Sequence, residues 1–183
     1  MKLDINNCYL LIIDIQEKLL SHIFNKGKIK YHSNLLVELF IELNIPIIYT
    51  EQYPKGLGST IKCLKKKLTN NNSKKIEKTT FSAFENKEFK NLLVQKKRNQ
   101  VIILGIESHI CVLQTAFDLL ENQMNVYIVE ECIGSRKLGD SKLGVDRMLK
   151  KGISLINFEM IFFELIRDSK NQFFKKLSSK YVK

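Results

Sequence analysis

Hydrophobic and polar residues follow one another along this chain in blocks whose period changes several times. Apolar runs of strand length occupy residues 8–14, 45–50, 100–104, 125–129 and 153–156, and a weaker strand candidate lies at 74–78. Helical spacing of apolar residues is found at 34–43, 60–68, 85–97, 109–123, 141–151, 160–166 and 172–179. Strands that alternate with helices predict parallel pairing, because each crossover helix returns the chain to the same end of the sheet.

The pattern therefore predicts an α/β fold with three layers, in which helices cover both faces of a six-stranded, mostly parallel sheet. The first run, residues 8–14, is apolar up to its final Asp, as expected for a central strand that is buried on both faces. Segment 51–59 contains Pro54, Gly56 and Gly58 and is predicted to be a loop. No repeat or change in composition divides residues 1–183, so we expect a single domain.

Composition narrows the class of protein. Hydrophobic residues make up 44% of the 183 positions, which is enough for a substantial core. The longest apolar stretch, Tyr9 to Ile13, is far shorter than the roughly 20 residues of a membrane span. The N-terminal residues MKLDINNC lack the apolar centre of a secretory signal. We therefore expect a cytoplasmic protein with no membrane partner.

The net charge of +11 raises the question of nucleic-acid binding. The lysines are scattered, however, and neither an RNP-like aromatic motif nor zinc-finger spacing accompanies them. A general compositional drift toward Lys, Asn and Ile explains the excess, so no nucleic-acid partner is expected. The charge would still favour anionic substrates, and binding of nucleic acid through the basic surface is kept as an alternative.

The four cysteines show neither CxxC spacing nor a cluster with histidine, which argues against a structural zinc site or a redox pair. Cys8, Cys63 and Cys132 are interpreted as structural thiols. Cys111 differs because it follows the fourth predicted strand. Ligands of open parallel sheets bind at the carboxyl ends of the strands. Asp14 and Lys78 end the first and third strands, so an acid, an amine and a thiol are predicted to meet at one edge.

These three groups suit nucleophilic catalysis. Cys111 lies in the first turn of its predicted helix, where the helix N-terminus and the Lys78 charge would favour a thiolate. Asp14 could accept the thiol proton and return it to a leaving amine, although it could also cap the next helix. Backbone N–H groups before Cys111 could stabilise an oxyanion. His109 does not face Cys111 at a helical spacing of two residues, so we expect it in a pocket wall.

Three motifs carry a family resemblance: Asp14-Ile-Gln16, the KxxxSAF pattern from Lys78 to Phe84, and Gly105-Ile-Glu-Ser-His-Ile-Cys111-Val. In this order and spacing the chain resembles the isochorismatase-like cysteine hydrolases, which include nicotinamidase and N-carbamoylsarcosine amidohydrolase. The resemblance covers nearly the whole chain. The run at 50–58 is most similar to the branch named isochorismatase domain-containing proteins.

The resemblance implies a three-layer, Rossmann-like α/β/α fold, a catalytic triad of Asp14, Lys78 and Cys111, and a homo-oligomer. It also implies a cis peptide at Ile106–Glu107 that directs the backbone N–H groups of Glu107 and Cys111 toward the oxyanion. Residues predicted to line the substrate pocket are Gln16, Gln52, Tyr53, Phe81, Ser82, Phe84, Ser108 and His109.

The chain departs from two members of this family. Nicotinamidases carry an Asp-x-His-x-His metal motif after the second strand, whereas this chain has Glu51-Gln-Tyr-Pro-Lys. We therefore expect no metal and no cofactor. True isochorismatases lack the nucleophilic cysteine, which argues against cleavage of a vinyl ether. The resulting hypothesis is a cysteine hydrolase that cleaves an amide-like C–N bond of a small metabolite through a thioester. The alternative is a non-catalytic binding or scaffold protein with the same fold.

Overall fold

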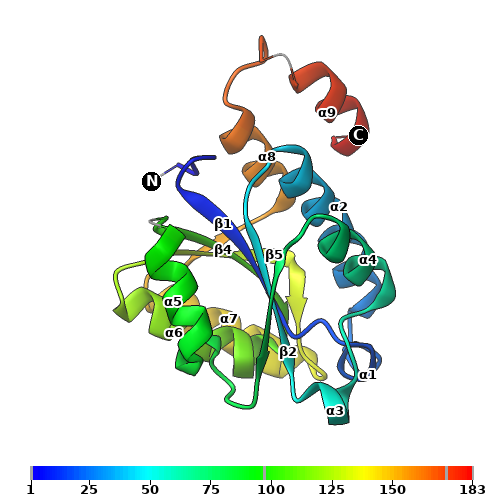
Figure 1. Ribbon diagram of the computed structural model, residues 1–183, viewed down its shortest axis with the longest axis vertical. Coiled ribbons are helices and arrows are strands. Elements are labelled where there is room, and N and C mark those ends of the chain that lie inside the picture. The colour runs from blue at the N-terminus through cyan, green and yellow to red at the C-terminus, as the bar shows by residue number, and fades with distance from the viewer. Residues whose placement is uncertain (1, 97, 172, 183) are drawn as a thin grey trace.

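A computed structural model describes residues 2–96, 98–171 and 173–182, and its centre is one parallel sheet (Figure 1). The strands are β1 (Cys8–Ile13), β2 (Ile47–Gln52), β3 (Lys74–Lys78), β4 (Gln100–Ile106), β5 (Asn125–Gly134) and β6 (Ser154–Ile156). Their order is β3-β2-β1-β4-β5-β6, and each neighbouring pair is parallel. The predicted sheet is confirmed, and it is parallel throughout.

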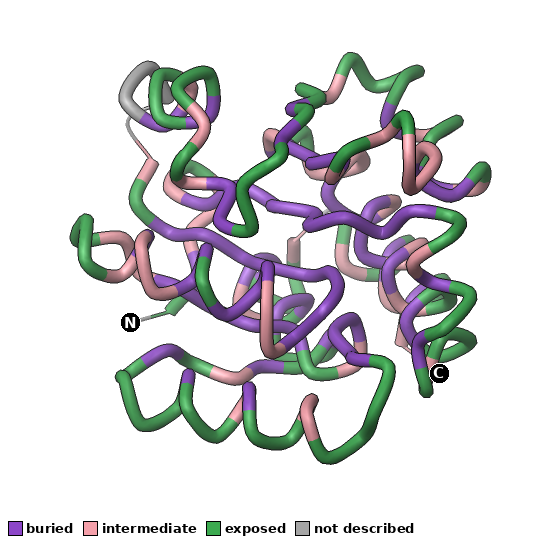
Figure 2. Tube along the Cα trace, turned by 90° about the horizontal axis from the view of Figure 1, so that it is seen from below, coloured by how far each residue is buried: buried purple, intermediate pink, exposed green. Residues whose placement is uncertain are grey.

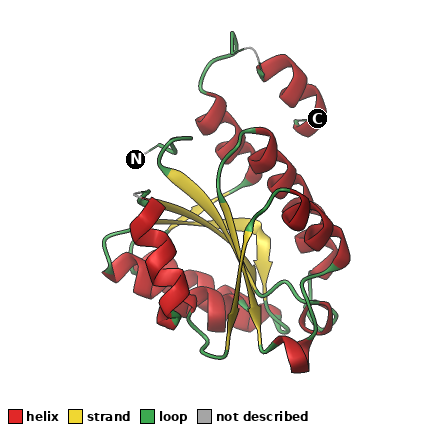
Figure 3. Cartoon of the chain, viewed as in Figure 1, coloured by secondary structure: helices red, strands yellow, loops and turns green. Residues whose placement is uncertain are grey.

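Helices cover both faces of this sheet (Figures 1 and 3). One layer contains α2 (Lys26–Glu42), α4 (Lys62–Asn70), α8 (Phe158–Ile166) and α9 (Phe174–Tyr181), and the other contains α5 (Lys87–Lys96), α6 (Leu113–Glu121) and α7 (Leu138–Lys150). The short helices α1 (Glu17–Leu20) and α3 (Pro54–Leu57) lie at the carboxyl edge, the edge of the sheet formed by the carboxyl ends of its strands. Across the described ranges, no helix is long and apolar enough to cross a bilayer. The three-layer prediction is confirmed.

The side chains of β1 divide between two hydrophobic cores. Cys8, Leu10 and Ile12 join the core beneath α2, α4 and α8, whereas Tyr9, Leu11 and Ile13 join the core beneath α5 and α6. All six residues of β1 are buried, in agreement with the continuous apolar run. Figure 2 shows buried residues along the centre of the molecule and exposed residues on its outer helices. Because β1 lies between β2 and β4, its carboxyl end occupies the point where the strand order changes direction. Ligands of such sheets bind at this point.

Several predicted boundaries were wrong, for identifiable reasons. Helix α2 begins at Lys26 instead of at 34, because its first turns are mostly exposed and show little apolar periodicity. Strand β5 was predicted to end at 129 but continues to Gly134, because its pairing with β4 resumes at Ile133 beyond the polar pair Glu130-Glu131. The predicted loop 51–59 contains the end of β2 and helix α3.

The remaining differences concern ends and short turns. The sequence pattern missed helix α1 and a 3₁₀ turn at Ala83–Glu85. The predicted helix at 109–123 is divided into a π turn, Ser108–Val112, followed by α6. Helix α9 begins at Phe174. Lys97 and Gln172, the predicted end of one helix and start of another, lie outside the described residues.

Gly105 allows β4 to pass very close to β1 at the carboxyl ends of these two strands. Its φ is 145°, and a Cβ atom placed there would lie 2.2 Å from the carbonyl oxygen of Ile13. The register of β4 against β5 also shifts between Ile103 and Gly105. A side chain at this position would force the two central strands apart, so the carboxyl edge depends on glycine.

We expect Gly105→Ala to lower the free energy of unfolding by about 2–3 kcal/mol, because the new methyl group meets backbone as well as an unfavourable φ. Gly152→Ala is the matched control: its φ is 96°, but nothing lies within 4 Å of the added atom. The control should therefore lose only about 1 kcal/mol. Urea denaturation of both variants measures the difference, and equal losses would contradict the role of the close approach.

Candidate active site

Three strand ends bring an acid, an amine and a thiol into contact beneath the carboxyl edge. Asp14 directly follows β1, Lys78 ends β3, and Cys111 lies in the π turn Ser108–Val112 after β4. Nζ of Lys78 lies 2.7 Å from Oδ2 of Asp14, and both side chains are fully buried. The Cys111 thiol lies near both groups, since the Asp14 charge raises its pKa and the Lys78 charge lowers it. The structure thus brings together the three residues that the sequence singled out.

Asp14 is held by its own backbone and by Thr50 of β2. Its φ of 52° is left-handed, so the chain turns sharply as it leaves β1. The Thr50 hydroxyl donates to Oδ1 of Asp14 at 2.6 Å, and the backbone N–H of Asp14 donates to the same hydroxyl oxygen at 3.2 Å. The alternative role as a helix cap is wrong, because the N-cap of α1 is Gln16. The carboxylate therefore faces Lys78 and Cys111 in a fixed orientation.

The Lys78 ammonium is surrounded by oxygen atoms. Besides Asp14, it donates to Oε1 of Gln52 at 2.7 Å and to the carbonyl oxygens of Thr80 and Phe81 at 3.2 and 3.1 Å. Gln52 is itself fixed, since its backbone N–H donates to Oε1 of Gln16 at 2.7 Å and its carbonyl accepts from Nε2 of Gln16 at 3.0 Å. Gln16 and Gln52 thus hold the lysine in place.

The Cys111 thiol is protonated at rest. Burial, followed by the nearby Asp14 charge, raises the pKa of Cys111 to about 12, and the Lys78 charge only partly opposes this. The sequence predicted a lowered pKa and a thiolate, whereas the pKa is raised, because the cost of burying an anion exceeds the attraction of Lys78. Any nucleophilic use of Cys111 therefore requires removal of its proton during the reaction.

The turn between β4 and Cys111 has the geometry that the family resemblance implied. The Ile106–Glu107 peptide bond is cis, which confirms that prediction. The Glu107 carboxylate accepts from the backbone N–H of Arg136 at 2.9 Å and from its Nε at 3.1 Å. The Glu107 carbonyl accepts from the N–H groups of Ile110 and Val112. These bonds fix the backbone on which the predicted oxyanion donors, Glu107 and Cys111, are located.

The aromatic residues predicted to line the pocket lie at the rim. Tyr53 and Phe81 are more than half exposed, at 55% and 56%. Phe84 is partly buried, and the Lys90 ammonium lies 4.9 Å from its ring centroid. Tyr53 and Lys78 also line an open depression of about 510 Å³ beside β3. Pocket lining by these three rings stays a prediction.

The polar residues predicted for the pocket are engaged in local contacts. The Ser82 hydroxyl donates to Asp118 and accepts from the backbone N–H of Phe84. Ser108 is buried, with its hydroxyl 3.2 Å from that of Ser141. His109 is partly exposed, and its Nδ1 lies 2.9 Å from the Ser135 hydroxyl. These contacts account for the side-chain polar atoms of Ser82 and Ser108 without a ligand.

Sequence reasoning missed three residues that shape the site: Thr50, Ser135 and Arg136. Thr50 holds Asp14, Ser135 contacts His109, and Arg136 fixes Glu107. Thr50 lies near the carboxyl end of β2, and the other two directly follow β5. The same rule that singled out Asp14 and Lys78 would have found them, had the true end of β5 been recognised.

Among the described residues, no three or more His, Cys, Asp or Glu side chains are grouped so that they could share a metal ion. Glu51, at the position of the metal motif in nicotinamidases, is buried and accepts from both the backbone N–H and the hydroxyl of Thr60, at 2.7 and 2.9 Å. The carboxylate of Glu51 thus supports the turn before α4.

Comparison with known proteins agrees with this geometry. The model of the isochorismatase domain matches residues 8–160. Isochorismatase family protein 1A of Dictyostelium discoideum is 39% identical over 94% of this chain and 84% of that protein. The structure of MAR1 ribonuclease from Caenorhabditis elegans is similar, with a TM-score of 0.92 and 36% identity, over 100% of this chain and 92% of that one.

A third relative is the YcaC gene product from Escherichia coli, described as an octameric hydrolase of unknown specificity. It has a TM-score of 0.92 and 26% identity, over 100% of this chain and 91% of that one. The fold, the matched domain and the identity to named relatives lead to one conclusion. The chain belongs to the isochorismatase family, whose members are generally hydrolases.

Proposed function

We propose that this protein is a cysteine hydrolase that cleaves an amide-like C–N bond of a small metabolite. The observation that carries the proposal is the buried Asp14–Lys78 ion pair beside the Cys111 thiol, whose pKa both charges affect. A thiol beside a carboxylate that can take its proton is the arrangement that nucleophilic catalysis needs. Cys111 is only 7% exposed, which favours a small substrate over a bulky one.

In the proposed first half-reaction, Asp14 removes the Cys111 proton as sulfur attacks the carbonyl carbon. The C=O bond opens to an oxyanion, which the backbone N–H groups of Glu107 and Cys111 stabilise. As the oxyanion re-forms its double bond, the C–N bond breaks and the leaving nitrogen takes the proton from Asp14. The products are an amine or ammonia and a thioester on Cys111.

In the second half-reaction, water replaces the amine. Asp14 removes a proton from water as its oxygen attacks the thioester carbonyl, and the proton then returns to the departing sulfur. A carboxylic acid, or a carbamic acid in the case of a ureide, leaves and the neutral thiol is restored. Lys78 donates a hydrogen bond to Asp14 and keeps its carboxylate oriented toward sulfur. These two half-reactions need no metal or cofactor.

A panel of primary amides, carbamoyl compounds and ureides tests the proposal. Release of ammonia or amine and an acyl adduct on Cys111 after rapid quenching, detected by intact-protein mass spectrometry, are the expected results. The mechanism would be contradicted if a panel member were hydrolysed without any adduct on Cys111 and at an unchanged rate after the Cys111 thiol is removed. Stoichiometric binding of panel members without turnover would favour the alternative of a non-catalytic binding protein.

The protonated thiol predicts a distinctive pH profile of alkylation. With its pKa near 12, Cys111 should react with iodoacetamide about tenfold faster for each pH unit between 7 and 10, without a plateau. Asp14 raises that pKa, so Asp14→Asn should lower it and accelerate labelling at pH 8. Peptide mass spectrometry resolves Cys111 from the other thiols. A plateau below pH 8 in the unmodified protein would show a thiolate at rest.

A second candidate function rests on charge and on one structural relative. The chain carries +11, and the similar protein from Caenorhabditis elegans is named a ribonuclease. Cleavage of RNA would need an extended basic surface, and its affinity would fall steeply with salt. Incubation of the protein with labelled single-stranded RNA at 50 and 200 mM salt tests this. RNA cleavage that survives Cys111→Ala would favour this candidate over the hydrolase.

We further propose that the chain acts as a homo-oligomer in the cytoplasm. The octameric relative supports assembly, and four free cysteines suit a reducing compartment. Several apolar side chains are more than 45% exposed and would be covered by assembly, among them Leu138, Leu143 and Phe163. Light scattering coupled to size-exclusion chromatography measures the assembly, and a monomer at micromolar concentration would contradict it.

A further inference from the structure

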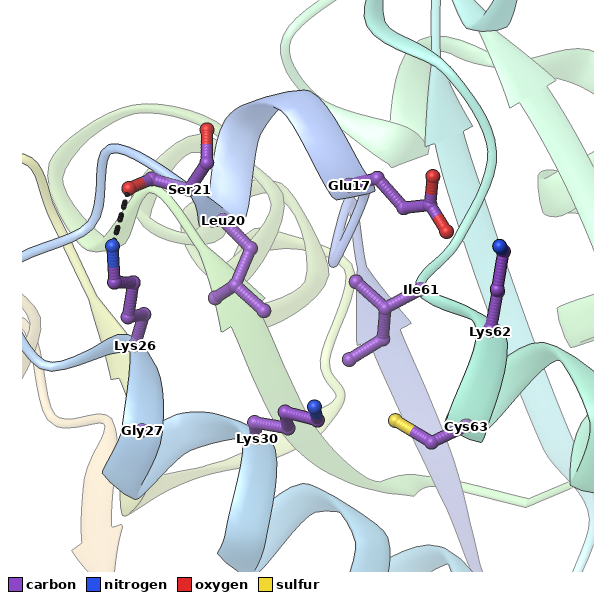
Figure 4. Close-up of a pocket in the computed structure, with 9 residues that line it drawn as sticks. All are labelled: Glu17, Leu20, Ser21, Lys26, Gly27, Lys30, Ile61, Lys62 and Cys63. Carbon is purple, nitrogen blue, oxygen red and sulfur yellow. Dashed lines mark hydrogen bonds between the residues drawn. The ribbon is translucent and has the colours of Figure 1, made fainter.

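A second cavity lies at the carboxyl edge, on the α2 and α4 side of the sheet. Its volume is about 590 Å³, within the usual range of small-molecule sites. Figure 4 shows α1 above it, the start of α2 on one side and the start of α4 on the other. The lining residues are Glu17, Leu20, Ser21, Lys26, Gly27, Lys30, Ile61, Lys62 and Cys63. None of the triad residues is among them.

The cavity combines an apolar wall with a positive rim. Leu20 and Ile61 are buried and point into the space, and the thiol of Cys63 lies beside Ile61 (Figure 4). Three lysines against one glutamate leave a net charge of +2 around the opening. An apolar wall below fixed positive charge is complementary to a ligand with an apolar body and an anionic group.

Two of the three ammonium groups are available to such a ligand. Nζ of Lys26 donates to the carbonyl oxygen of Ser21 at 2.9 Å (Figure 4). Within the described ranges, the ammonium groups of Lys30 and Lys62 have neither a hydrogen bond nor an ion pair. They come from different helices, α2 and α4. In Figure 4 the Lys30 ammonium points into the space toward Ile61, whereas the Lys62 ammonium points toward the Glu17 carboxylate, so Lys30 is the nearer partner for an anion on the apolar wall. Each ion pair between an exposed lysine and the anion would contribute modestly to the binding free energy, and contact with the apolar wall would supply the rest.

The cavity is separated from the triad by a wall that backbone hydrogen bonds hold in place. The N–H of Glu17 donates to the carbonyl of Ser59 at 3.1 Å, and the N–H of Ile61 donates to that of Ile15 at 3.0 Å. Gln16, between these residues, turns its amide the other way, toward Gln52 and Gly58. The space is therefore distinct from the thiol site and built on fixed elements.

We propose that this cavity binds a small organic anion with an apolar body, at a site independent of the proposed hydrolysis. Cys63 provides a marker for its occupancy. Cys63 is partly exposed, whereas the other three cysteines are buried, so small electrophiles should label it first. A ligand in the cavity would cover the thiol and slow that labelling.

Gly27 offers a way to fill the cavity without disturbing the fold. A Cβ atom on Gly27 would meet nothing within 4 Å, and the residue is the second of helix α2, where Leu is a better helix former than Gly. Gly139 is a matched control: it is the second residue of α7, is equally open, and lies outside the cavity. Gly27→Leu should block the site, whereas Gly139→Leu should not.

The test uses 8-anilinonaphthalene-1-sulfonate, an aromatic anion that becomes fluorescent in apolar sites, titrated into the intact protein. We expect saturable binding that weakens at least about tenfold in Gly27→Leu, and about fivefold when Lys30 and Lys62 are both replaced by Gln. Gly139→Leu and Cys111→Ala should bind within about twofold of the unmodified protein. Saturating dye should slow modification of Cys63 by N-ethylmaleimide, read by peptide mass spectrometry.

Four outcomes would overturn the proposal: no saturable binding, equal effects of the two glycine variants, no protection of Cys63, or loss of binding in Cys111→Ala, which would place the dye at the thiol site. The uncharged analogue N-phenyl-1-naphthylamine tests the role of charge. It should bind at least about fivefold more weakly than the sulfonate. Equal binding of the two dyes would show that the lysines do not recognise the anion.

Discussion

Replacement of Cys111 by alanine should lower turnover at least about 10,000-fold while the fold stays intact. Neither Asp14 nor Lys78 can replace the thiol, because removal of sulfur leaves no atom that can form the thioester. The Asp14–Lys78 ion pair does not depend on sulfur and should persist in the variant. Initial rates with the best member of the amide panel, measured beside circular dichroism and thermal unfolding, provide the readout.

Cys132→Ala is the matched control for this experiment. Cys132 is fully buried, and burial raises the pKa of its thiol well above the usual range, but it belongs to the core on the α2 side. Its loss should cost stability without changing the rate per folded molecule. A Cys111→Ala variant that retained more than a tenth of the activity would rule out covalent catalysis by this thiol.

The sheet was predictable because most of its strands are apolar and bounded by polar residues. Residues 8–13 form a central strand with six buried side chains, as the sequence pattern indicated. Strand β5 was only half recognised, because Glu130 and Glu131 interrupt its apolar run while the ladder continues opposite β4 at Ile133. The start of α2 was missed since its first turns gain little from burial. Pairing with β4 decided where β5 ends, and the local pattern carries no record of that pairing.

The proximity of Asp14, Lys78 and Cys111 was predictable because each follows a strand of one parallel sheet, and parallel strands end at the same edge. Their contacts were not. That Lys78 reaches Asp14 from β3, across β2, depends on the register in which Gln52 pairs with Lys78. The support of Asp14 by Thr50 likewise depends on side-chain direction at the end of β2.

The protonation state of Cys111 illustrates a further limit of the sequence. The sequence places a cation and a helix start near the thiol, and both favour a thiolate. Burial opposes them, and its extent follows from how tightly the core beneath α5 and α6 closes around Cys111. The cis peptide before Glu107 was anticipated from family resemblance alone, since nothing in the local residues Ile106 and Glu107 distinguishes it.

Replacement of Lys78 by methionine should destabilise the protein by about 3–5 kcal/mol at neutral pH, because it leaves the buried Asp14 carboxylate without its counterion. Methionine fills a similar volume but cannot donate to Asp14, Gln52 or the two carbonyl oxygens that Lys78 satisfies. For a chain of this size the loss corresponds to a fall in Tm of roughly 6–20 °C. Turnover should also fall, since Asp14 loses the group that orients it.

Two further variants identify the cause of that loss. Lys74→Met, on the same strand, changes an exposed lysine with no hydrogen-bond or ion-pair partner among the described residues, and should alter stability by no more than about 0.5 kcal/mol. The double variant Asp14→Asn with Lys78→Met removes the stranded charge and should be more stable than Lys78→Met alone. If the double variant were instead less stable than Lys78→Met at neutral pH, the ion pair would not be what Lys78 contributes, and the packing of its side chain would be the remaining cause.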